Sequence, residues 1–139
     1  MKKILVAIDI ARTGGNDLVI QTAKDLAGAM GSEVAMLHVI EPTPSYVLAE
    51  VPQGVLAKRQ EVAAEELRKI AATHDLTEAV VREGPPATEI LDYAEKIGAE
   101  LIVLHSHDPD LSDYFIGSVA VRVVRHAHCS VHVVRQASA

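Results

Sequence analysis

The chain of 139 residues is acidic, with a formal net charge of −6, and 49% of its residues are hydrophobic. This charge argues against non-specific binding to nucleic acid or to an anionic membrane surface, and an aromatic content of 3% leaves few rings for stacking on bases. The length suits a single domain, expected to span 1–139, with a core of Val, Leu, Ile and Ala.

The cysteine content and the N-terminal sequence bear on where in the cell the protein is expected. Cys129 is the only cysteine, so the chain cannot form an intrachain disulfide, which suits a reducing environment. The apolar run near the N-terminus is short and soon meets polar and acidic residues, unlike a signal peptide or a membrane span. We therefore expect a cytoplasmic protein without membrane insertion.

Apolar runs alternate with segments of helical periodicity along the whole chain. The strands are predicted at 4–8, 34–40, 79–82, 101–104 and 131–134, and the helices at 18–30, 54–73, 88–97 and onward from Gly117-Ser118. The apolar positions of the second predicted helix are Val55, Val62, Leu67 and Ile70. Those of the fourth are Val119, Val123 and Val124. Glycines end two helices, at Gly31 and Gly98. The loop 41–52 could serve as a lid or as a partner surface.

The alternation of strands and helices predicts parallel pairing in a three-layer α/β sandwich of the Rossmann-like type. In such a sheet, ligands bind beyond the carboxyl ends of the strands. If the first and fourth strands are neighbours, Asp9 meets the polar segment 105–107, and Val39 at the end of the second strand lies close by.

A helix that begins at Gly117-Ser118 presents free N–H groups and the positive end of its dipole, and both favour an anion such as phosphate. The alternative is that Ser118 simply caps the helix, a common role for serine.

The other polar residues give weaker indications. His105 and His107 could form a zinc site with Asp9 or Asp108, but no third ligand stands at a defined spacing, and we assign no metal ligands. His38, within a predicted strand, is expected to be a hydrogen-bonded core or interface histidine. No Walker lysine or nucleophile elbow is present, so no catalytic residue is assigned.

Four segments carry a resemblance to a known family: KILVAIDI at 3–10, LHVIEP at 37–42, SHDPDLSDYFIGS at 106–118 and VVRHAHCSVHVV at 123–134. Over essentially its whole length the sequence resembles the universal stress protein family. The Ser-His-x-Pro-Asp loop before Gly-Ser is similar to that of a UspA-like, nucleotide-binding subgroup. The resemblance implies strand order 3-2-1-4-5 and an adenine nucleotide alpha hydrolase-like fold.

The resemblance also implies an adenine nucleotide ligand, ATP or else ADP or AMP. The residues that match the family's binding positions are Ala7, Asp9, Val39, Leu104, His105, Ser106, His107, Gly117, Ser118, Val119 and Ala120. The chain departs from the family's glycine motif, because His105 and Asp108 stand where its first two glycines align. A carboxylate at Asp108 would repel a triphosphate, so Mg²⁺ or Mn²⁺ is expected with the nucleotide.

The predicted fifth strand is apolar and would lie at the edge of the sheet, where it invites pairing with another chain. The resemblance implies a homodimer through this terminal strand, 130–135. The function expected from the resemblance is that of a dimeric, ATP-binding regulator of the stress response with an unknown protein partner. Two alternatives remain: a nucleotide-independent interaction module of the same fold, and a slow ATP hydrolase.

Overall fold

The structure is a computed structural model that describes residues 2–10, 14–42, 53–106 and 117–135. Its strands are β1 (Lys3–Ala7), β2 (Glu33–Ile40), β3 (Ala79–Glu83), β4 (Ala99–His105) and β5 (Ser130–Val134). Its helices are α1 (Asn16–Met30), α3 (Gln53–Thr73), α4 (Pro86–Ile97) and α5 (Ser118–His126).

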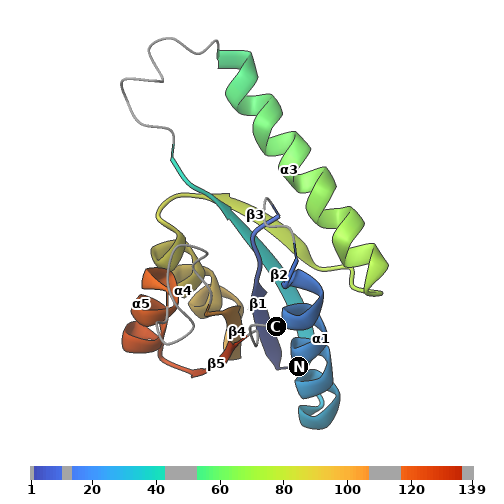
Figure 1. Cartoon of the computed structure of the whole chain (residues 1–139), viewed down its shortest axis with the longest axis vertical. Coiled ribbons are helices and arrows are strands. Elements are labelled where there is room, and N and C mark those ends of the chain that lie inside the picture. Colours follow the sequence, from blue (N-terminus) through green and yellow to red (C-terminus); the bar gives the residue numbers. More distant parts are fainter. Residues whose placement is uncertain (1, 11–13, 43–52, 107–116, 136–139) are drawn as a thin grey trace.

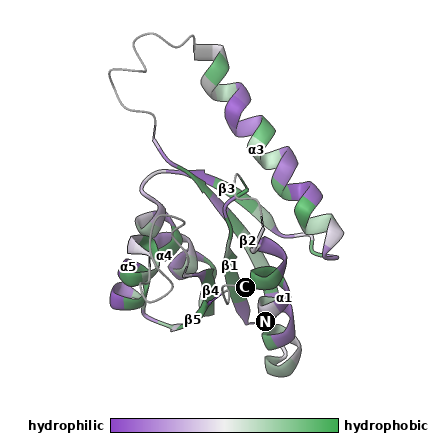
Figure 2. Ribbon diagram, viewed as in Figure 1, coloured by the Kyte–Doolittle hydropathy of each residue, from purple (hydrophilic) through white to green (hydrophobic). Residues whose placement is uncertain are grey.

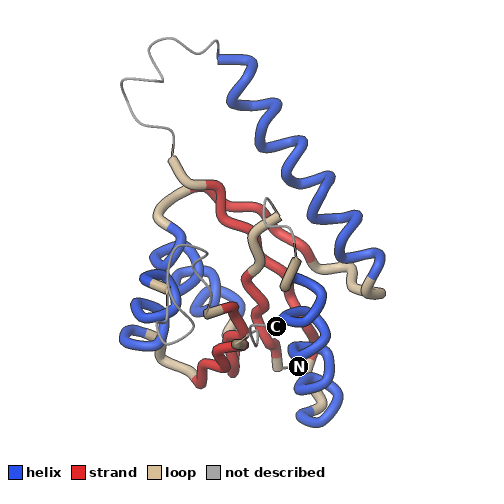
Figure 3. Tube along the Cα trace, in the orientation of Figure 1, coloured by secondary structure: helices blue, strands red, loops and turns tan. Residues whose placement is uncertain are grey.

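All four strand pairs are parallel, and the strands lie in the order β3-β2-β1-β4-β5 (Figure 1). The predicted five-stranded α/β fold, its strand order and its four helices are confirmed, although several helix and strand ends differ from prediction by one or two residues. Figure 3 shows helices on both sides of the sheet, as a three-layer sandwich requires.

The two faces of the sheet bury separate apolar clusters because successive strand residues point to opposite sides. On one face, Ile4 and Val6 of β1 lie in a cluster with residues of α1 and with Leu67 of α3. On the other face, Leu5 lies in a cluster with residues of α4 and α5. The sheet is correspondingly hydrophobic in Figure 2, whereas α3 alternates between hydrophilic and hydrophobic residues.

Glycines end α1 and α4, as predicted. Gly31 (φ 67°) and Gly98 (φ 64°) both adopt the left-handed conformation that ends a helix, and their N–H groups donate to carbonyl oxygens of the last turn.

The predicted apolar faces of two helices need correction. Val124 of α5 is 51% exposed, because α5 buries Ala120 and Val123 and the next residue lies about 100° around the helix. Val55 and Val62 of α3 are each 53% exposed for a similar reason. Among the described side chains of α3, the buried ones are Ala63, Leu67 and Ala71, spaced four residues apart.

Within the described part of the chain, no helix is both long enough and apolar enough to cross a membrane.

Candidate functional site

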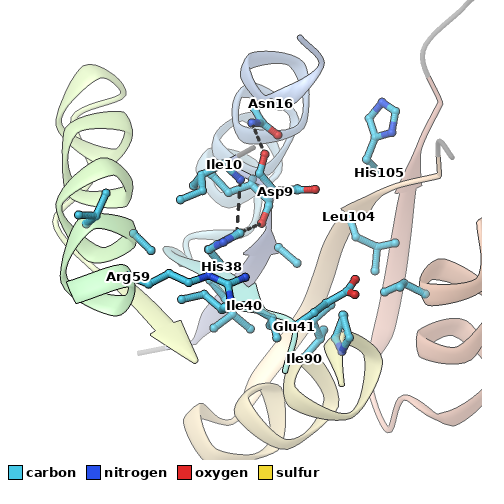
Figure 4. A pocket seen from close by; sticks show the side chains of 18 residues that line it. Asp9, Ile10, Asn16, His38, Ile40, Glu41, Arg59, Ile90, Leu104 and His105 are labelled. Atoms are coloured by element: carbon cyan, nitrogen blue, oxygen red, sulfur yellow. Dashed lines mark hydrogen bonds between the residues drawn. The ribbon is translucent and has the colours of Figure 1, made fainter. Parts of the chain in front are cut away.

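A cleft of about 610 Å³ opens at the carboxyl ends of β1, β2 and β4 (Figure 4). This volume is within the range of sites for small organic ligands. Most of the lining is apolar, with six polar or charged side chains among it. The lining residues are Ala7, Ile8, Asp9, Ile10, Asn16, Leu37, His38, Val39, Ile40, Glu41, Arg59, Val62, Ala63, Pro86, Ile90, Leu104, His105 and Val119.

Hydrogen bonds to α1 and to β2 hold the chain after β1 against the cleft. The Asn16 side-chain Nδ2 donates to the carbonyl oxygen of Asp9 over 2.8 Å, which ties the start of α1 to the end of the β1 segment. The backbone N–H of Ile8 donates to the carbonyl oxygen of Leu37 over 2.9 Å and so continues the pairing with β2. The Asp9 backbone is therefore fixed, while the residue itself is exposed.

His38 is buried at the floor of the same cleft. Its ring Nδ1 lies 3.1 Å from the carbonyl oxygen of Ile8 and 3.4 Å from the backbone nitrogen of Ile10. A protonated Nδ1 donates to Ile8, and an unprotonated one accepts from Ile10, so either tautomer is hydrogen-bonded. The expectation of a hydrogen-bonded core histidine is thus confirmed, and the ring also joins β2 to the chain after β1.

The start of α5 is attached to the end of β4. The backbone N–H of Gly117 donates to the carbonyl oxygen of Ser106 over 2.8 Å, and the N–H of Ser106 donates to Val134 over 3.0 Å. Gly117 occupies the N-cap position, so the alternative that Ser118 is the cap is wrong, and no side chain of the described residues caps the helix. The first turn of a helix has N–H groups without intrahelical acceptors, and here they lie beside the carboxyl end of β4.

Comparisons with known proteins agree with this architecture. The family model described as "Universal stress protein family" matches residues 1–135. The chain belongs to the universal stress protein family. Universal stress protein MJ0531 of Methanocaldococcus jannaschii is 31% identical, over 97% of this chain and 82% of its own length.

Solved structures share the fold of this universal stress protein at lower identity. Hypothetical protein MJ0577 superposes with a TM-score of 0.81 at 24% identity, covering 99% of this chain and 98% of that one. A universal stress protein crystallised in complex with cAMP gives a TM-score of 0.68 at 16% identity, covering 98% of each chain. At these identities the likeness establishes the fold.

The residues that the universal stress protein resemblance assigned to a site fall into three groups. Those that line the cleft are Ala7, Asp9, Val39, Leu104, His105 and Val119. Those at the β4 end and the α5 start that do not line it are Ser106, Gly117, Ser118 and Ala120. His107 lies outside the described residues, as do Asp108 and most of the loop 41–52.

The contribution of α3 and α4 to the cleft was not predicted from the sequence. Arg59, Val62 and Ala63 come from α3, and Pro86 and Ile90 from the first turns of α4. Helical periodicity could place these residues on helices but could not show which helix face overhangs the strand ends.

The charged lining of the cleft has both signs: Asp9 and Glu41 carry carboxylates and Arg59 a guanidinium. Among the described residues, no group of three or more His, Cys, Asp or Glu side chains could hold a metal ion. The cleft therefore offers an apolar slot with a few polar groups, and beside it a helix N-terminus suited to an anion.

Proposed function

We propose that this universal stress protein binds an adenine nucleotide, ATP, in the cleft at the carboxyl ends of β1, β2 and β4. One observation carries the proposal: a single cleft has apolar walls from Val39, Ile40 and Leu104, while the start of α5, which no described side chain caps, lies at the β4 end. Apolar walls suit a nucleobase, and helix N–H groups suit phosphates. The universal stress protein solved in complex with cAMP adds support for this ligand class.

The Ser-His-x-Pro-Asp sequence at 106–110 further supports membership of the nucleotide-binding, UspA-like subgroup. In that assignment Gly117, Ser118 and the following N–H groups of α5 hold the phosphates, and Asp9 faces the nucleoside. A bound Mg²⁺ or Mn²⁺ would reduce the repulsion between phosphate oxygens and nearby carboxylates. The Asp9 carboxylate fits such an ion, because Mg²⁺ is usually held by one or two carboxylates together with phosphate oxygens and water.

The proposal includes a homodimer joined through β5, acting in the cytoplasm as a regulator of the stress response. Among the strands that the structure describes, β5 pairs only with β4 and lies at the edge of the sheet, so its other side is open to a second strand. The nucleotide would alter the surface that a partner protein recognises.

A second candidate is a nucleotide-independent interaction module, and one observation favours it. His105 lines the cleft at a position where the family's motif has glycine, so its side chain occupies space that a glycine would leave to the ligand.

Direct analysis of the purified protein separates the two candidates. Small molecules released on denaturation are identified by chromatography and mass spectrometry, and stripped protein is titrated with Mg-ATP by calorimetry. A second assay measures phosphate release, since a slow hydrolase would show turnover above background. No released nucleotide and no heat of binding, from a folded protein, would reject the nucleotide proposal.

Two substitutions at one position test the assigned phosphate end. Ser118→Glu places a negative charge among the N–H groups of the first turn of α5, and we expect affinity for Mg-ATP to fall by more than about ten-fold. Ser118→Ala keeps those N–H groups and removes only a hydroxyl, so it should weaken binding by less than about ten-fold. Equal affinities for the two variants would show that the phosphates lie elsewhere.

A further inference from the structure

One wall of the cleft comes from α3, which contributes none of the binding positions that the family resemblance assigns. α3 packs over β3 and β2. Its residues Arg59, Val62 and Ala63 line the cleft. Figure 4 shows Arg59 extending from α3 toward His38 and Ile40, on the β2 side of the opening.

The side chains on this wall are suited to a flat ring. Val62 is 53% exposed although it lies beside the buried Ala63, so it offers apolar surface that a ligand could cover. Val39 and Ile40 of β2 also line the cleft and add further apolar surface. The guanidinium of Arg59 is planar and can stack on an aromatic face.

The order of the strands determines which end of a nucleotide would reach this wall. The start of α5 adjoins β4, whereas α3 lies over β2 and β3, with β1 between β2 and β4. Adjacent strands are about 4.8 Å apart, so β2 and β4 are separated by about 10 Å. A ligand with its phosphates at α5 therefore extends its base toward α3.

We infer that Arg59 and Val62 form the base-binding wall of the cleft and determine its affinity for a nucleobase. The inference rests on the proposed nucleotide function and extends it to α3. Arg59 stacks on or donates to the base, and Val62 covers the ring edge. Neither residue contacts the phosphates.

The chain contains a matched control for each residue. Val55 lies on the same helix and is exposed to the same extent, 53%, but it does not line the cleft. Lys58 precedes Arg59, is exposed and does not line the cleft. The experiment therefore compares Val62→Ala with Val55→Ala, and Arg59→Ala with Lys58→Ala, by calorimetry with adenosine, Mg-ATP and inorganic tripolyphosphate.

We expect Val62→Ala to weaken adenosine and Mg-ATP by about five-fold, from the lost apolar contact. Arg59→Ala should weaken both by about five- to thirty-fold, as expected for a desolvated cation stacked on a ring. Neither variant should change binding of tripolyphosphate, and both controls should stay within about two-fold of the original affinity. Thermal unfolding of the variants checks that each remains folded.

The possible outcomes separate this inference from the proposed function. If the unmodified protein binds neither adenosine nor Mg-ATP, the proposed function fails and the inference fails with it. If it binds both, but Val62→Ala and Arg59→Ala behave like their controls, only the role of α3 is rejected. If Arg59→Ala weakens tripolyphosphate as strongly as Mg-ATP, Arg59 contacts phosphate and the inference is wrong.

Discussion

Leu67 attaches α3 to the sheet, and its truncation should destabilise the protein strongly. Its side chain is completely buried, in a cluster with Ile4, Met36 and Ala71. Leu→Ala substitutions at buried positions cost about 2.7–5 kcal/mol. We expect a value near the lower end, about 3 kcal/mol, because small alanines flank the site on α3 and allow partial collapse.

This loss corresponds to a clear shift in melting temperature. Unfolding entropies of about 2.1 cal/mol/K per residue give about 0.3 kcal/mol/K for a chain of this length. Leu67→Ala should therefore lower Tm by about 10 °C. Urea denaturation followed by circular dichroism measures the free energy of unfolding, and the slope m should be unchanged if the native state stays equally compact.

Val55→Ala is the control for Leu67→Ala. Val55 is on the same helix but 53% exposed, and its truncation should change stability by less than about 0.5 kcal/mol. A loss below about 1 kcal/mol for Leu67→Ala, or equal losses for both variants, would refute the reasoning that burial of Leu67 holds α3 on the sheet.

Two further predictions concern β5 and the residue just before it. Val133, half-buried on β5 and paired with Leu104, should tolerate charge poorly if a second copy adds a strand there, so Val133→Asp should sediment as a monomer. Val124→Asp, on the exposed side of α5, is its control, and an unchanged dimer in Val133→Asp would exclude the β5 interface. Burial raises the pKa of the Cys129 thiol, so near pH 8 its thiolate fraction is below that of free cysteine. Iodoacetamide should then alkylate Cys129 more slowly in the folded protein than in urea. Equal rates would contradict the conclusion that burial raises the pKa of this thiol.

The sequence predicted the layers of the fold because a buried parallel strand reads as a continuous apolar run. The runs around Ile4, Met36 and Ile102 became the three interior strands, β1, β2 and β4, each buried on both faces. The order of the strands came from the family resemblance, since periodicity does not say which strands are neighbours. Helix faces were less predictable: Val62 and Val124 are apolar but exposed, because side-chain chemistry alone does not determine which turn of a helix meets the sheet.

The site was predicted in part for a geometric reason. Residues at the ends of parallel strands meet at one edge, so strand ends and the resemblance pointed to Asp9, Val39 and His105, which line the cleft. Arg59 was not predicted, because its place in the cleft depends on how α3 crosses the sheet. Asn16 was also missed, although it opens α1 directly after two glycines, a position where a polar side chain often reaches back to the preceding loop.

The central position of β1 has a consequence for synthesis of the chain on the ribosome. β1 is made first, and β2 can pair with one of its sides soon afterwards, but its other side pairs with β4, which comes nearly a hundred residues later. Throughout that interval an apolar strand has an unpaired edge, the feature that favours association between incomplete chains. The sheet cannot be completed until most of the polypeptide has emerged. The yield of folded protein should therefore depend on how quickly the segment that contains β4 is translated, and on the concentration of other incomplete chains nearby.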